Sequence, residues 1–177
     1  MVAAVLALVL RPPAKKSNPL ELGAQAPALA GDAVRDGKIS LADLRGHTVL
    51  LSFLNSRAES TSKRDPSRAQ IVFLRSMQRQ HTRFGLHVII VDAAKIAGAG
   101  EPSRNELIND TYDWNLGPSI ALIGDDGARA RQFGVHRIPT TFLIGRDGVL
   151  RERWEGFAAA AQLDFALRRL ERRGATG

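Results

Sequence analysis

The apolar residues of this 177-residue chain fall into short continuous runs separated by polar, glycine-containing segments. Three of the runs have strand length and no alternating polar face, which predicts strands buried on both sides: TVLLSFL (48–54), LHVIIVDA (86–93) and SIALIG (119–124). Three intervening segments are predicted as helices from their apolar spacing or a closing glycine: 67–84, 105–114 and 128–135. Alternating strands and helices of this kind are typical of an open α/β sheet with a parallel centre.

The last third of the domain changes character. The run TTFLIGRDGVLRERW (140–154) predicts an antiparallel hairpin with its turn at Arg146–Gly148. Residues 159–173 then place Leu163, Ala166, Leu167 and Leu170 on one face of a final helix. The hairpin is therefore expected at one side of the parallel strands.

Three shorter signals concern turns and the ends of elements. The stretch GKISLADLRGH predicts a turn at Asp36–Gly37, a short strand, and a half-turn at Leu41–Leu44. Before the first long helix, Asp65 is a predicted N-cap and Pro66 the first helical residue. Asp125–Asp126, followed by Gly127, could be read as paired carboxylates, but a turn with a capping aspartate is the expected structure.

The N-terminus is predicted to lie outside the domain. Residues 1–19 form an apolar segment and linker, residues 20–173 the domain, and residues 174–177 a tail. Val2–Leu10 is uninterrupted and apolar but too short to span a bilayer. It fits the core of a signal sequence or the end of a membrane anchor, and equally a loosely packed tail. The first interpretation places the protein at the cell envelope, membrane-anchored or exported; the alternative is the cytoplasm.

Composition restricts the chemistry. There is no cysteine, which excludes disulfides, thiolate metal sites and an encoded thiol nucleophile. The net charge is +7, but the basic residues are spread over most segments, and the densest cluster, RRLERRG (168–174), alternates with an acid on a predicted helix. We interpret that cluster as a solvated helix face, and nucleic-acid binding is not expected.

Two stretches carry a family resemblance: ELGAQAPAL…GKISLADLRGHTVLLSFL and FGVHRIPTTFLIGRDGVLRERWEG. They resemble the thioredoxin-like redoxins, which include the AhpC/TSA peroxiredoxins and the TlpA/ResA-type thioredoxins. The likeness covers roughly residues 20–172, and the run Ile-Pro-Thr-Thr-Phe-Leu-Ile is its most specific part. It implies a thioredoxin-like fold, a central mixed β-sheet flanked by helices, and a cis-proline at Pro139. In that family the activity is thiol oxidoreduction or antioxidant peroxide removal.

The chain departs from the resembled family in the loop after residue 54. Aligned on Phe53, Ala58 and Thr61 occupy the positions of the Cys-x-x-Cys pair. Dithiol exchange needs a thiolate nucleophile and a resolving thiol, and a serine or threonine hydroxyl supplies neither. Intrinsic disulfide exchange and peroxide reduction are therefore excluded, and no catalytic residue is predicted.

The expected binding residues gather at this loop and at the cis-proline: Ser56, Arg57, Ser60, Thr61, Ile138, Pro139 and Thr140. We expect the backbone of Ile138 to be free to pair with an extended protein or peptide partner. Positive charge beside a helix N-terminus also suits an anion or a small thiol. A nucleophilic serine would need a base nearby and the sequence nominates none, so loop and capping roles are expected for the serines.

The four histidines, at 47, 81, 87 and 136, show no metal-ligand spacing, and neither metal nor cofactor is predicted. The sequence thus predicts a binding or accessory module that acts through the cis-proline groove. Two alternatives stay open: an oxidoreductase or transferase that uses an external low-molecular-weight thiol, and a structural interaction domain.

Overall fold

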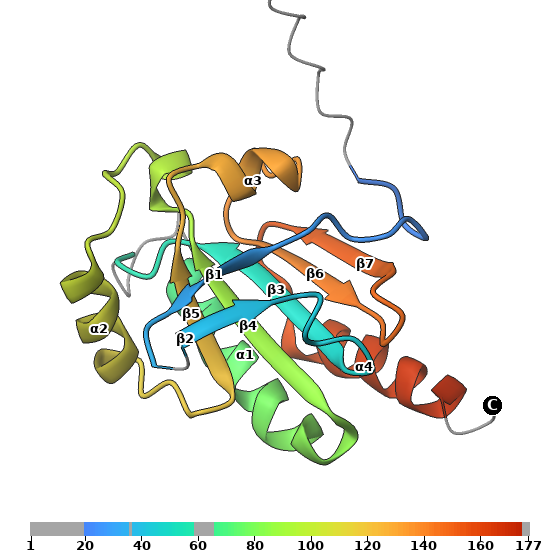
Figure 1. Cartoon of the computed structure of the whole chain (residues 1–177). Helices are drawn as coiled ribbons and strands as arrows, with labels where there is room; N and C mark the ends of the chain where they lie inside the picture. The colour runs from blue at the N-terminus through green and yellow to red at the C-terminus, as the bar shows by residue number, and fades with distance from the viewer. Residues whose placement is uncertain (1–19, 36, 59–65, 175–177) are drawn as a thin grey trace, which may run out of the picture.

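The computed structural model describes residues 20–35, 37–58 and 66–174. Its centre is a five-stranded sheet in the order β5-β4-β3-β6-β7 (Figure 1). The strands are β3 (Thr48–Leu54), β4 (Leu86–Asp92), β5 (Ile120–Gly124), β6 (Thr140–Ile144) and β7 (Leu150–Glu155). β3, β4 and β5 run parallel, whereas β6 and β7 are antiparallel to their neighbours. The mixed sheet predicted from the sequence is confirmed.

The central strand β3 is apolar throughout because both of its faces are covered. All seven of its residues are buried. Leu50 and Leu54 pack into the core on one side of the sheet, while Leu51 and Phe53 pack into the core on the other. A continuous apolar run is the pattern that such a doubly covered strand requires.

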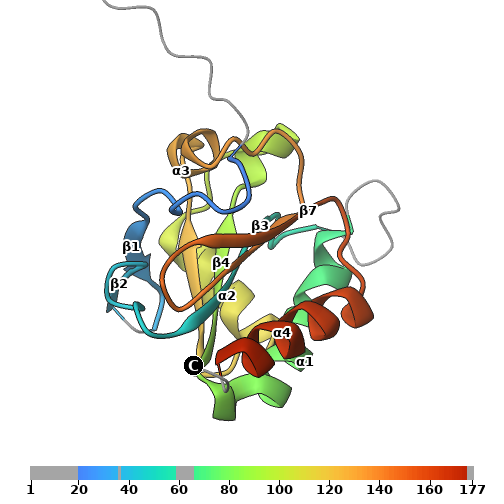
Figure 2. The ribbon, with the colours of Figure 1, turned by 90° about the vertical axis from the view of Figure 1, so that its right-hand side faces the viewer.

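Each face of the sheet has its own cover (Figure 2). On one face lie α1 (Ser67–His81), α2 (Arg104–Asp113) and α4 (Ala160–Gly174), whose buried side chains share a core with β3 and β4. On the other face lie α3 (Ala128–Gln132), the segment around Leu29, and a hairpin of β1 (Ala30–Ala33) and β2 (Gly37–Ser40). The two cores together fix the carboxyl ends of the strands, where the candidate site lies.

Some boundaries differ from expectation. α1 begins at Ser67, with Pro66 as its N-cap residue, so the prediction of Pro66 as the first helical residue is wrong by one position. Its last predicted turn is a separate 3-10 turn, Thr82–Phe84, ended by Gly85 in the left-handed conformation. β1 was not predicted because its sequence, AGDA, has no apolar run; pairing with β2 creates it.

Several sequence predictions fall on residues outside the described ranges. These are the apolar segment 2–10 with its linker, Asp36, the N-cap Asp65, and the candidate residues Ser60 and Thr61. Within residues 20–35, 37–58 and 66–174, none of the helices has the length and hydrophobicity needed to cross a bilayer.

Candidate binding site at the carboxyl ends of the central strands

Ser56 lies under the surface rather than on it. It follows β3 and is only 2% exposed. Its Oγ contacts the carboxylates of Asp92, at the end of β4, and Asp110, on α2, the latter at 2.5 Å. A hydroxyl has a single hydrogen to donate, so it can donate to only one of the two carboxylates. The other contact is a hydrogen bond only if that carboxyl carries a proton, so hydrogen bonding to both aspartates requires one proton shared between them.

The surroundings favour that protonated state. Burial raises the pKa of Asp92 above its ordinary 3.8, and the hydrogen bond from Ser56 offsets only part of the effect. Burial also raises the pKa of Asp110, where the neighbouring charge of Asp92 adds to the shift. The second carboxylate oxygen of Asp92 accepts the backbone N–H of Ala94 at 2.8 Å, which fixes the side chain in place.

Asp110→Asn is expected to flatten the pH dependence of stability. Because the folded-state pKa values of the pair are raised, the native protein binds more protons than the unfolded chain between pH 3.8 and those values. The free energy of unfolding therefore falls as pH rises through that window. An asparagine amide can donate to Ser56 Oγ without ionising, so the variant should lose less stability. Urea unfolding from about pH 4 to 8 measures this.

Asp32→Asn is the control, because Asp32 is exposed on β1 and is not among the groups that shift the pKa of Asp92 or Asp110, so the wild-type profile should be unchanged. The lowered pKa of His87, caused by its burial and by His47, acts in the opposite direction but equally in all three proteins. Parallel curves for wild type and Asp110→Asn would contradict the shared proton.

The side chain of Arg57 is hydrogen-bonded to α2 and to the loop before it. Its guanidinium donates to Glu106 Oε1 at 3.0 Å and to the carbonyl of Gly100 at 2.6 Å. Glu106 in turn closes a capping box with Ser103 at the start of α2. The hydrogen bonds from Ser103 are the largest of the effects that lower the pKa of Glu106. This arrangement fixes the chain after β3 to the N-terminal turn of α2.

Trp114 completes the attachment from the other end of α2. Its indole N–H donates to the carbonyl of Ser56 at 3.0 Å, and the guanidinium of Arg68 lies over its ring at 4.3 Å. The indole is 7% exposed, so it packs beneath the loop and does not form an open groove wall.

The Ile138–Pro139 peptide bond is cis and lies directly before β6. Pro139 is buried and accepts the backbone N–H of Gly156 at 2.8 Å, while Thr140 Oγ1 donates to the carbonyl of Arg137 at 2.6 Å. Ile138 is half-buried against the core. Among the described residues, its backbone N–H has no acceptor and its C=O has no donor.

The sheet brings the two halves of the predicted site to one end. Phe53 of β3 pairs with Thr140 of β6, so the chain after β3 and the chain before β6 lie at the same end of the sheet. Ser56, Arg57 and Ala58 thus share this end of the molecule with residues 138–140. Ser60 and Thr61 lie outside the described part of the chain.

Sequence reasoning missed the two aspartates. It nominated no base for a serine, yet the structure places two carboxyl groups on Ser56. The one available signal was Asp92, a charged residue that ends an otherwise apolar buried run. Because Ser56 is almost fully buried, the cluster organises the loop and does not present a nucleophile to solvent.

The remaining titratable clusters have structural partners. Asp125 accepts the backbone N–H groups of Arg129 and Ala130, and Asp126 that of Ala128, which agrees with the predicted turn and capping role. Within the described ranges, no group of three or more His, Cys, Asp or Glu side chains is arranged to hold a metal ion.

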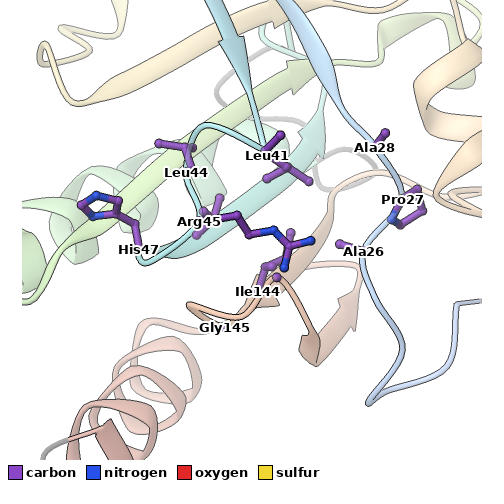
Figure 3. Close-up of a pocket in the computed structure, with 12 residues that line it drawn as sticks. Ala26, Pro27, Ala28, Leu41, Leu44, Arg45, His47, Ile144 and Gly145 are labelled. Atoms are coloured by element: carbon purple, nitrogen blue, oxygen red, sulfur yellow. The ribbon is translucent and has the colours of Figure 1, made fainter.

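A small pocket of about 170 Å³ lies at the opposite end of the sheet, near the start of β3 and the end of β6 (Figure 3). Apolar residues such as Leu41, Leu44 and Ile144 line it. Arg45 reaches across it and is held by Gln25 Oε1 at 2.9 Å and by the carbonyl of Asp147. It is separate from the candidate site and already carries its own polar contacts.

The fold and the site define a thioredoxin-like protein that contains no cysteine. A family model described as the AhpC/TSA family matches residues 22–153. The chain belongs to the AhpC/TSA family.

Its relatives share most of the domain. The chain is 24% identical over 155 residues to the thiol-disulfide oxidoreductase ResA of Bacillus thuringiensis subsp. konkukian, covering 88% of this chain and 82% of that relative. It is 25% identical over 152 residues to ResA of Bacillus anthracis, covering 85% and 79%.

Solved structures agree. A provisionally assigned thiol:disulfide interchange protein DsbE of Chlorobium tepidum superposes with a TM-score of 0.69 at 25% identity, covering 86% of this chain and 99% of that one. The exposed lipoprotein thioredoxin Etrx1 of Streptococcus pneumoniae superposes with a TM-score of 0.60 at 18% identity, covering 81% and 100%. These likenesses establish the thioredoxin-like fold.

Proposed function

We propose that this protein binds an extended polypeptide segment at residues 138–140 and acts as an accessory module, without thiol chemistry of its own. The observation that carries the proposal is the unpaired backbone of Ile138 at the end of the sheet where β3 ends and β6 begins. An extended segment could complete those hydrogen bonds in the manner of an added strand. Burial of the adjacent Pro139 and Thr140 keeps that backbone rigid, which lowers the entropic cost of binding.

The chemistry of the site favours binding over catalysis. The relatives are named thiol-disulfide oxidoreductases, but this chain has no cysteine. Among the described residues, Ser56 has the hydroxyl closest in sequence to Ala58. This hydroxyl is buried and contacts two carboxyl groups. It therefore offers no free nucleophile to a substrate or to an external thiol.

An aromatic side chain next to the cis-proline gives the partner an apolar contact. The hydrogen bond from Gly156 to the carbonyl of Pro139 fixes the start of the β7–α4 connection beside the cis peptide. Phe157 follows immediately, is 42% exposed, and stacks on Phe73 with ring centroids 5.2 Å apart. A partner side chain could bury the open face of this ring.

We place this function at the cell envelope. The support is the apolar run Val2–Leu10 in the sequence and the fold shared with a pneumococcal exposed lipoprotein thioredoxin. An N-terminal attachment there would leave the domain free to meet extracytoplasmic polypeptides.

Titration with a reduced, carboxymethylated, permanently unfolded protein is expected to shift the amide resonances of residues 56–58, 138, 140, 156 and 157. Phe157→Ala should weaken this binding roughly tenfold, because the exposed part of a phenyl ring contributes on the order of 1 kcal/mol when covered. NMR titration of wild type and variant gives both results.

Phe165→Ala is the matched control, since Phe165 is also exposed, at 62%, but lies on α4 away from the cis peptide. It should leave the affinity unchanged. Resonance shifts confined to other regions, or equal losses in the two phenylalanine variants, would contradict binding at residues 138–140.

A further inference from the structure

Helices α1 and α4 lie side by side on one face of the sheet and turn their outer surfaces to solvent (Figure 2). The distribution of charge on these two helices is one-sided. Residues 67–84 include arginines at 68, 75, 79 and 83 and no aspartate or glutamate, and α4 adds arginines at 168, 169 and 172. Arg68 lies over the ring of Trp114, which leaves Arg75, Arg79 and Arg83 for the outer surface of α1 and the turn after it. The spread of basic residues along the sequence thus becomes a concentration in space, which we call the α1–α4 face.

The acids of α4 neutralise this face only in part, because Asp164 and Glu171 are directed into the seam between the helices, where they hold His81. The imidazole of His81, on α1, is held by Asp164 at 2.9 Å and by Glu171 at 2.6 Å. Asp164 also accepts a hydrogen bond from Arg168, which lowers its pKa. Asp164 and Glu171 expose 28% and 19% of their side chains. The carboxylates therefore hold the helices together while arginines occupy the outer surface.

Two arginines of α1 have no carboxylate of their own. Among the described residues, Arg75 and Arg79 make no ion pair, whereas Arg168 and Arg169 pair with Asp164 and Glu152. Arg79 is exposed and Arg75 half-buried, and guanidinium groups without internal partners keep their full charge for an external anionic surface.

Apolar side chains are interspersed with these arginines. Val72 on α1 is 49% exposed, Phe84 at the end of the following 3-10 turn 37%, and Phe165 on α4 62%. The guanidinium of Arg83 lies 4.7 Å from the ring of Phe84, so cation and aromatic ring are presented together. Large apolar side chains exposed among arginines are the composition of surface helices that rest on lipid headgroups.

We propose that the α1–α4 face docks onto the surface of an anionic lipid bilayer. The arginines contact lipid phosphates, and Val72, Phe84 and Phe165 enter the boundary between headgroups and acyl chains. A nucleic acid would satisfy the arginines equally, but its phosphate backbone gives an aliphatic side chain such as Val72 nothing to bury against. In this orientation the face of the sheet covered by the β1–β2 hairpin points away from the membrane.

The absence of cysteine allows one probe per molecule in the full chain. Ala161→Cys places an environment-sensitive fluorophore on the exposed side of α4, one turn before Phe165. Ala42→Cys places the same fluorophore on the opposite face, in the turn before β3. Because the apolar run 2–10 could bind vesicles by itself, the readout is the local signal at each position and not total binding.

Vesicles of phosphatidylcholine with phosphatidylglycerol are expected to blue-shift the probe at position 161 and to leave the probe at position 42 unchanged. Vesicles of phosphatidylcholine alone, or high salt, should remove most of the shift. Arg75→Gln with Arg79→Gln should weaken the response about 30-fold, as expected for the loss of two basic contacts. Phe165→Ser should weaken it while leaving the melting temperature unchanged.

Three results would overturn the proposal. The first is binding of the vesicles without a shift at position 161, which would assign the contact to the N-terminal segment. The second is an equal shift at positions 161 and 42. The third is a stronger response to a single-stranded oligonucleotide than to anionic vesicles, which would assign the face to nucleic acid.

Discussion

Wild-type protein should reduce insulin no faster than dithiothreitol alone, and Ala58→Cys with Thr61→Cys should raise the rate roughly tenfold or more above that background. The absolute lack of a thiol explains the first result. The second follows from the scaffold, which places residue 58 between the end of β3 and the 15-residue helix α1. Pairing in a Cys-x-x-Cys motif lowers a cysteine pKa from about 8.5 toward 7, which raises the reactive thiolate fraction at neutral pH about tenfold.

Two controls separate a restored site from the mere addition of thiols. Glu59→Cys with Ser62→Cys has the same spacing one residue later and should stay near the reagent background. Ala58→Cys alone should form mixed disulfides with insulin but turn over poorly, because it has no resolving thiol. Equal activity of the two pairs would show that residues 58 and 61 are not in register with the family's cysteines.

Phe53→Ala is expected to lower the free energy of unfolding by about 3–5 kcal/mol, the usual result of deleting a fully buried phenyl ring. Phe53 is 0% exposed in the central strand. Its ring lies 5.3 Å from that of Phe133 and 6.0 Å from that of Phe142, so three elements meet on it. The cavity cannot close without moving β3, which is paired on both sides. Urea denaturation monitored by circular dichroism measures the loss.

Phe165→Ala is again the control, because the same side-chain deletion at a 62% exposed position should change stability by no more than about 0.5 kcal/mol. A loss below about 1 kcal/mol for Phe53→Ala would mean that the β3–β6 core is not the main source of stability.

How well the sequence alone predicts a secondary-structure element differs from one part of the chain to the next. Strands such as β3 were predictable because burial on both faces demands an unbroken apolar run, and this run coincides with the strand Thr48–Leu54. β1 was not predictable, because the four residues AGDA become a strand only through their pairing with β2. Local sequence patterns identify elements that bury a large apolar area. They fail for an element such as β1, whose extended conformation depends on hydrogen bonds to a neighbouring strand.

For function, the sequence by itself determined what chemistry is absent, because it contains no thiol, and it predicts that Ala58 stands at the first cysteine position of the family's active-site loop. Only the tertiary structure decided the environment of that loop. It joins Ser56 to Asp92 and Asp110, which are 36 and 54 residues away along the chain, and it turns Asp164 and Glu171 inward onto His81. Hydrogen bonding and shared protons depend on distances of a few ångströms between remote residues, and a linear pattern carries no information about those distances.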